Sequence, residues 1–170
     1  TTTSDEAVAT APTATNITSG VTTDFYSVAN GQYVDIENVA DNTFAKKMLG
    51  DGFAIDPADG TITTPVDGTV STVFPTKHAI GFKTDSGLEI LLHMGIDTVE
   101  LNGAPFEVLV QTDQPVHHGE VVAKADLAAI KAAGKATTMM VIITNMDAVN
   151  LMKFKMLTNQ VKVSDEIMLV

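Results

Sequence analysis

The sequence predicts an all-β protein: an antiparallel β-sandwich, barrel-like in outline, with a few short helices. From Asp24 onward, short apolar runs are interrupted about every 8–12 residues by Gly, Asp, Asn or Pro, which favour turns. Several runs are rich in β-branched residues, as in Thr61–Thr64, Thr69–Phe74 and Glu107–Val110. Short strands at this regular spacing are typical of sandwiches and barrels.

Two segments have a helical pattern. Asn42–Leu49 has room for one or two turns, and Ala125–Ala133 contains good helix formers followed by Gly134, a residue that commonly ends helices. Further along, Val141–Ile143 and Val161–Val170 return to strand composition. Helices are therefore predicted to be a minor part of the fold.

The beginning of the chain differs in composition from the rest. Residues 1–23 are rich in Thr, Ala and Ser and have no sustained apolar period. Such a segment buries too little apolar surface to offset the entropy of ordering it. We therefore predict a flexible linker or tail over residues 1–23, either a plain chain end or a tether to another domain. One folded domain is predicted over residues 24–170.

The composition disfavours several classes of protein. Among 170 residues, 21 are acidic and 10 are Lys or Arg, giving a net charge of −11. Nucleic-acid binding needs clustered cations, so no nucleic-acid partner is expected. The absence of Cys excludes disulfides, thiolate metal sites and a cysteine nucleophile. Since no apolar run approaches the length of a membrane span, we expect a cytoplasmic domain without direct membrane insertion.

The segment Pro75–Asp97 contains two of the four histidines and a turn signal at Thr84–Gly87. A hairpin symmetric about this turn would place His78 directly opposite His93, on one face of the sheet. Ile80, Phe82 and Leu91 would then form an apolar floor beneath the two imidazoles.

A second register is open for the same hairpin. A bulge at Gly87 would shift the pairing by one residue and place His93 opposite Ala79. The two histidines would then lie on different faces, unless a second irregularity in the chain brought them back together.

A pair of imidazoles is suited to phosphoryl transfer. An imidazole nitrogen is a competent nucleophile near neutral pH, and the reaction needs positioning and stabilised phosphoryl oxygens above all. One histidine can attack while the other donates a hydrogen bond. Thr76 could orient an imidazole, and Asp97 could do the same or meet a cationic partner, although ordinary turn roles fit both spacings.

Longer motifs give a resemblance to a known family. The stretch Thr64–Phe106 contains PVDGTV, TKHAIGF, the turn DSG and LEILLHMGIDTVELNG, in that order. It is similar to the core of the glucose-type IIA (EIIA) domains of the phosphoenolpyruvate-dependent sugar phosphotransferase system. The resemblance extends from Asp24 to Val170.

The resemblance implies a phosphoryl carrier built as a β-sandwich with a shallow site. His93 would accept a phosphoryl group from the histidine phosphocarrier protein and pass it to a cysteine on the IIB domain of a sugar permease. His78 would stabilise the transferred group, Thr76 would hydrogen-bond His78, and Asp97 would lie at the partner-facing rim. The N-terminal linker could tether such a domain to a membrane permease.

The resemblance also implies a hydrophobic ring around the histidines for docking partners. Leu91 stands where some relatives have an aromatic residue, and Asn42-Thr43 replaces a more apolar pair, so the ring could suit different partners. The matching positions are Val39, Phe44, Met48, Leu49, Phe74, Leu91 and Ile96.

No cofactor and no intrinsic metal site are expected from the family. Zinc bound by His78 and His93, with a third ligand from a partner, is the one exception that the resemblance implies. His117 and His118 match no family motif and are interpreted as an exposed turn, with weak metal binding as a minor alternative.

The sequence leaves three alternatives to the carrier function. A regulatory IIA domain, acting on permeases or metabolic enzymes according to its phosphorylation, would need the same histidine. A zinc hydrolase normally uses three protein ligands plus water, whereas this segment offers two histidines and Asp97 and lacks a His-x-His pair. A purely structural sandwich would explain neither the paired histidines nor the motifs.

Overall fold

The computed structural model of the protein describes residues 22–155 and 158–170, and it is built almost entirely from antiparallel strands. The strands form one eight-stranded sheet, in the order β13-β2-β3-β11-β7-β6-β5-β9, and two three-stranded sheets, β4-β10-β8 and β1-β14-β12. This architecture confirms the predicted all-β sandwich with few helices. The large sheet is open, with β13 and β9 at its edges, and does not close into a barrel.

The strands are β1 (Asp24–Tyr26), β2 (Gly31–Asp35), β3 (Asp51–Pro57), β4 (Thr61–Thr63), β5 (Gly68–Val73), β6 (Ala79–Lys83), β7 (Glu89–Ile96), β8 (Phe106–Val108), β9 (Pro115–Val116), β10 (Val121–Ala125), β11 (Ala136–Ile143), β12 (Lys153–Phe154), β13 (Gln160–Val161) and β14 (Glu166–Leu169). The helices are α2 (Asn42–Ala45), α3 (Leu127–Ala132) and the 3-10 turns η1 (Ile36–Asn38), η2 (Thr98–Leu101) and η3 (Met146–Ala148).

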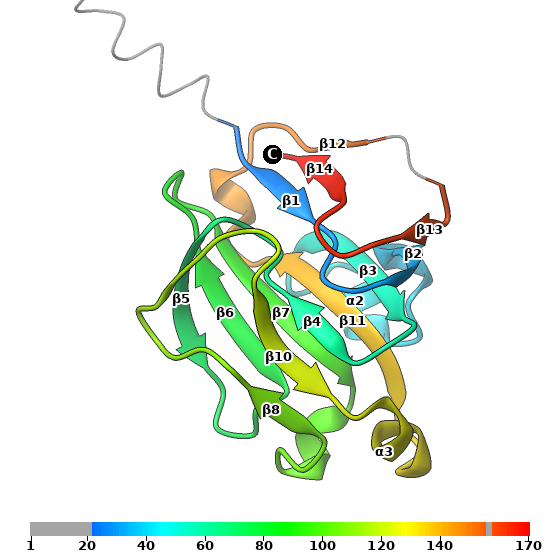
Figure 1. Cartoon of the computed structure of the whole chain (residues 1–170). Coiled ribbons are helices and arrows are strands. Elements are labelled where there is room, and N and C mark those ends of the chain that lie inside the picture. The colour runs from blue at the N-terminus through cyan, green and yellow to red at the C-terminus, as the bar shows by residue number, and fades with distance from the viewer. Residues whose placement is uncertain (1–21, 156–157) are drawn as a thin grey trace, which may run out of the picture.

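The main core lies between the large sheet and the sheet β4-β10-β8, which crosses in front of it in Figure 1. The small sheet contributes Ile62 and Val122, both fully buried. The large sheet contributes Phe82 and Leu92 from β6 and β7, also fully buried. Burying such side chains supplies most of the free energy of folding, at roughly 1.5–3 kcal/mol for each.

A second, smaller hydrophobic cluster lies on the other face of the large sheet, under the segment that carries η1 and α2. We call it the outer cluster. Because it covers β3, β11 and the end of β7, it gives the large sheet a second apolar face beside the histidine hairpin. Its buried members are Ile36, Val39, Phe44, Ala54, Ile96, Met140 and Ile142.

Both predicted helices are present but shorter than expected. The Asp41 side chain caps α2 by accepting hydrogen bonds from the main-chain N–H groups of Thr43 and Phe44. The helix ends early because Lys47 adopts a left-handed conformation, with φ of 59°. Asp126 caps α3 in the same way, and Gly134 follows it with φ of 79°, as its sequence position predicts. Within the described ranges, no helix is long and apolar enough to cross a membrane.

The first described residues of the chain join the sheet β1-β14-β12. The predicted domain start, Asp24, is the first residue of β1, and the main-chain N–H of Thr23 already donates to Val170 at 2.8 Å. The predicted tail therefore reaches the fold at its last residues, whereas residues 1–21 of it lie outside the described part of the chain.

Candidate functional site

The register of the β6–β7 hairpin is the shifted one, so the symmetric alternative is wrong. His93 pairs with Ala79, and Phe82 pairs with Ile90. The cause is the turn. The Gly87 N–H donates to the Thr84 carbonyl at 3.0 Å, and Gly87 has φ of 95°, which makes it the extra residue of a bulge.

The two histidines nevertheless meet, because a second irregularity precedes β6. Lys77 has φ of 59°, so His78 lies in a bend and escapes the alternation of the strand. The ring centroids of His78 and His93 are 5.0 Å apart, with the rings at 76° to each other. The Met94 N–H donates to the His78 carbonyl at 2.7 Å and ties the bend to β7. The predicted juxtaposition is therefore correct, and it arises through the shifted register with a second irregularity rather than through the symmetric hairpin.

The shift of register also changes the apolar surroundings of the pair. Ile80 and Phe82, predicted as the floor, point into the main core instead, while Leu91 packs against the outer cluster on the histidine side. Two aromatic rings contact the imidazoles directly. Phe44 lies 4.9 Å from His93 and Phe74 lies 5.5 Å from His78, both between ring centroids.

A main-chain oxygen determines the protonation of His93. Its Nδ1 lies 2.8 Å from the carbonyl oxygen of Gly95, which can only accept, so Nδ1 carries the proton. Nε2 is thereby left with its lone pair. Gly95 presents this carbonyl through a φ of 86°, and a Cβ at this position would come within 2.4 Å of Thr98 Cγ2. The site therefore requires Gly at position 95 for both conformation and space.

Burial keeps the His93 imidazole neutral. Loss of hydration disfavours the charged ring and lowers the pKa of His93 to about 4. The Gly95 hydrogen bond and the carboxylates of Asp41 and Asp97 oppose this shift, whereas the neighbouring His78 reinforces it. At neutral pH the ring is therefore an uncharged base.

His78 is held by a side chain. Its Nδ1 lies 2.7 Å from the hydroxyl oxygen of Thr76, the contact that the sequence predicts. The residue is only 7% exposed, and burial lowers the pKa of its imidazole as well. A neutral His78 that accepts the Thr76 hydroxyl proton at Nδ1 carries its own proton on Nε2.

Asp97 lies near the pair without orienting it. It has a left-handed conformation (φ of 61°), is exposed, and precedes η2 without a side-chain capping bond. Gly95 performs the orienting role that the sequence suggested for Asp97. Residue types do not reveal a main-chain acceptor; a glycine two positions after His93 was the only available signal.

The seven positions predicted for the docking ring differ in exposure. Met48 and Leu49 are the most exposed, at 70% and 43%. Phe74 and Leu91 are half-buried. Val39, Phe44 and Ile96 are buried members of the outer cluster and have little surface to offer a partner.

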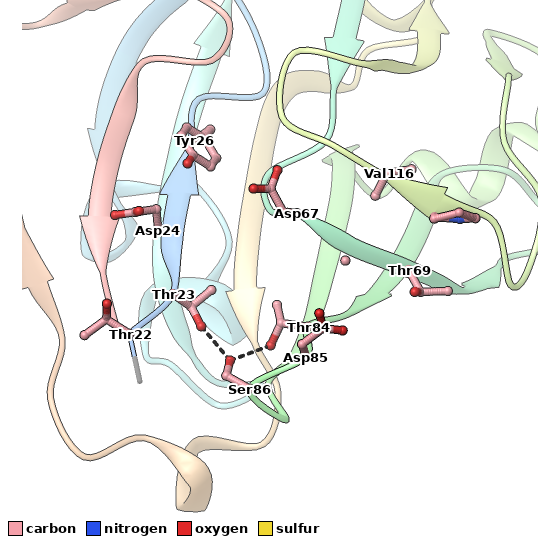
Figure 2. Close-up of a pocket in the computed structure, with 12 residues that line it drawn as sticks. Thr22, Thr23, Asp24, Tyr26, Asp67, Thr69, Thr84, Asp85, Ser86 and Val116 are labelled. Atoms are coloured by element: carbon pink, nitrogen blue, oxygen red, sulfur yellow. Dashed lines mark hydrogen bonds between the residues drawn. The ribbon is translucent and has the colours of Figure 1, made fainter. Parts of the chain in front are cut away.

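The hollow in Figure 2 does not include the histidine pair. That hollow, of about 480 Å³, is lined by Thr84, Asp85 and Ser86 at the turn end of the same hairpin. Within the described residues, no third His, Cys, Asp or Glu ligand joins His78 and His93 in a cluster suited to a metal ion. The pair alone offers two of the three protein ligands that catalytic zinc normally requires.

Comparison with known proteins identifies the relatives of this fold. The family model for the phosphoenolpyruvate-dependent sugar phosphotransferase system, EIIA 1, matches residues 23–149. The glucose permease IIA from Mycoplasma capricolum has a similar structure, with a TM-score of 0.76 and 35% identity over 88% of this chain and 96% of that one.

Curated proteins similar to this chain belong to the same phosphotransferase system. The glucose-specific EIIA component of Halalkalibacterium halodurans is 44% identical over 122 residues, 72% of this chain and 70% of the relative. The glucose-specific EIICBA component of Streptococcus pneumoniae serotype 4 is 53% identical over 135 residues, 79% of this chain. The chain spans about a fifth of that relative and of the EIICBA component of Staphylococcus saprophyticus, 19% and 18% of their lengths.

The fold and these matches define a component of the bacterial sugar phosphotransferase system. The chain belongs to the EIIA 1 family of that system.

Proposed function

We propose that this domain carries a phosphoryl group on Nε2 of His93, between the histidine phosphocarrier protein and a cysteine of a IIB domain during sugar uptake. The observation that carries the proposal is the hydrogen bond from His93 Nδ1 to the Gly95 carbonyl, 2.8 Å long. Because it fixes the proton on Nδ1, the nitrogen that remains to attack phosphorus is Nε2.

Neutrality of the ring supports the same role. With a pKa near 4, nearly every His93 imidazole has a free lone pair at pH 7. Attack of Nε2 forms a new P–N bond as the P–N bond of the donor phosphohistidine breaks, so the donor histidine recovers the lone pair. The reaction requires no general base on this chain.

His78 supplies the complementary group. With the Thr76 hydroxyl donating to Nδ1, the Nε2–H of His78 donates to a phosphoryl oxygen. His93 supplies the lone pair and His78 supplies the hydrogen-bond donor, with their ring centroids 5.0 Å apart. A hydrogen-bond donor aimed at the transferred group stabilises the charge that develops on it.

Partners dock on the surface around the pair. Met48 and Leu49 offer exposed apolar area, and Phe74 and Leu91 offer half-buried area closer to the rings. Asp41 and Asp97 add negative charge near His93, which favours a cationic partner surface and faster encounter. The glucose-specific relatives suggest glucose as the sugar, and the EIICBA relatives suggest a tether to a membrane permease.

The test is reconstitution with phosphoenolpyruvate and the two general phosphotransferase proteins. We expect an acid-labile phosphoryl group on the wild-type domain, none on His93→Gln, and stable labelling of His78→Gln that cannot pass to a IIB domain. Labelling that persists in His93→Gln would overturn the assignment. If wild type is labelled but does not deliver to any IIB cysteine, the regulatory alternative replaces the delivery step.

A further inference from the structure

The second pair of histidines, which the proposed function does not use, lies against a carboxylate. His117 and His118 follow β9 at the start of the turn to β10, with ring centroids 4.1 Å apart. Asp67 lies in the loop before β5. Its Oδ1 is 3.3 Å from His117 Nδ1 and 2.9 Å from His118 Nδ1.

We propose that Asp67, His117 and His118 form a surface binding site for a divalent transition-metal ion, with Zn²⁺ as the representative ligand. The metal would be held by the two Nδ1 atoms and by Oδ1, with water completing the coordination. Within residues 22–155 and 158–170, this is the one group of three His, Cys, Asp or Glu side chains whose ligand atoms lie within 4.8 Å of one another.

The distances suit a tetrahedral ion. With metal–ligand bonds of about 2.0–2.2 Å, neighbouring ligand atoms of a tetrahedral zinc lie about 3.3–3.6 Å apart. The two Nδ1–Oδ1 separations, 3.3 and 2.9 Å, require adjustments of only a few tenths of an ångström. The His117 side chain, 68% exposed, is free to make them.

Two of the three ligands are oriented before any metal arrives. The main-chain N–H of His118 donates to Asp67 Oδ1 at 2.6 Å and holds the carboxylate. The His118 ring stacks on Tyr26 of β1, with centroids 4.2 Å apart and planes at 20°. In Figure 2, Tyr26 and Asp67 come from separate segments to the edge of the same hollow. A site with fixed ligands loses less entropy on binding.

The donor set indicates the class of metal. Two imidazole nitrogens and one carboxylate oxygen suit Zn²⁺ and neighbouring transition metals, whereas Ca²⁺ and Mg²⁺ prefer oxygen ligands throughout. Binding through Nδ1 requires that the proton shared between His118 and Asp67 move to Nε2 or to solvent. The metal then replaces a hydrogen-bonded contact with a link between the loop before β5 and the turn after β9.

The experiment is calorimetric titration of the whole chain with ZnCl₂. We expect one Zn²⁺ per chain. Because loss even of a group that only orients a ligand typically weakens metal binding 10–100-fold, Asp67→Asn and His117→Gln should each weaken it at least tenfold. Asp85→Asn, which removes another carboxylate from the same hollow, and His93→Gln, in the other histidine pair, should retain wild-type affinity.

Tyrosine fluorescence gives an independent readout, because the chain has no Trp and only two Tyr. In Tyr33→Phe, Tyr26 is the remaining fluorophore, and Cu²⁺ bound at His118 should quench it saturably. The exposed His117 makes His117→Gln a safe second variant if Asp67→Asn unfolds, which melting without metal will reveal. Absence of zinc binding, equal affinity in wild type and His117→Gln, or loss of binding in His93→Gln would each overturn the proposal.

Discussion

The two histidine pairs of this domain have similar spacing and opposite surroundings. Their ring centroids are 5.0 Å apart in one pair and 4.1 Å in the other. His78 and His93 lie beside the outer cluster, and each Nδ1 contacts an uncharged oxygen. His117 and His118 lie in a solvent-exposed turn, and both direct Nδ1 toward the carboxylate of Asp67.

The difference shows that the partner atom and the exposure of the ring determine what an imidazole can do. A buried ring with a neutral partner stays uncharged and keeps Nε2 available for bond formation. A carboxylate partner instead favours a positive charge nearby, on the ring or on a metal. Burial acts to raise the pKa of Asp67, but hydrogen bonds from His118 outweigh it and lower that pKa, so the carboxylate remains charged.

The largest expected effect is on phosphoryl acceptance, and it should appear for a substitution at one end of the β6–β7 hairpin but not at the other. His93→Gln should lower the rate of phosphoryl acceptance at least ~1000-fold, because the attacking lone pair is lost. Asp85→Asn, in the turn at the far end of the hairpin, is the matched control and should keep the wild-type rate. Rapid-quench labelling with the phosphorylated carrier protein measures both, and similar rates for the two variants would contradict the assignment.

A smaller loss is expected when the oxygen partner of His93 is displaced. Gly95→Ala introduces a Cβ within 2.4 Å of Thr98 Cγ2 and strains a backbone with φ of 86°. Misplacing the Gly95 carbonyl by even about 1 Å should slow phosphoryl acceptance roughly 10–100-fold. The same assay checks this, with thermal melting to confirm that the variant is folded. An unchanged rate would mean that another group fixes the tautomer of His93.

The next prediction concerns a substitution that gives His78 a carboxylate partner like the one that His117 and His118 have. Thr76→Asp gives His78 a carboxylate partner, so the pKa of His78 should rise above that of the wild-type ring. Thr76→Val removes the hydrogen bond without adding charge and should not raise it. Histidine NMR titration distinguishes the two variants. If Thr76→Asp leaves the titration of His78 unmoved, burial rather than the partner atom controls this ring.

The smallest effect is on stability. Since the folded pKa of His93 is about 4 and the unfolded value is near 6.5, the unfolded chain binds more protons between these values. The stability contributed by the neutral ring is therefore present above pH 6.5 and is lost as the pH falls toward 4. Between pH 7 and 5 we expect a loss of about 1 kcal/mol, allowing for partial exposure of the ring.

Urea unfolding of wild type and His93→Gln at the two pH values measures this contribution, because the variant should lack it. Equal pH dependence in both proteins would contradict a depressed pKa at His93.

The fold class, the pairing of His78 with His93 and the Thr76 contact could be predicted from the sequence, from turn spacing and short motifs. Turn residues at regular spacing predicted the strands, and Asp24 is the first residue of β1. The register of the β6–β7 hairpin was harder to predict, because the alternation of side chains between the two faces of a strand reverses at every irregular residue. Gly87 signals one such reversal, but the left-handed Lys77 does not, since lysine carries no preference for that conformation. Ile80 and Phe82 were consequently placed on the wrong face.

The hydrogen bond from His93 Nδ1 to the Gly95 carbonyl makes the protonation of His93 independent of the side chains on the surrounding surface. A carbonyl of the main chain cannot be removed by substitution, ionised or oxidised, so the proton on Nδ1 of His93 does not depend on which side chains occupy the neighbouring surface. Substitutions at exposed positions such as Met48 and Leu49 should therefore leave the protonation of His93 unchanged. On the proposed function, the docking surface can change while Nε2 of His93 keeps its lone pair.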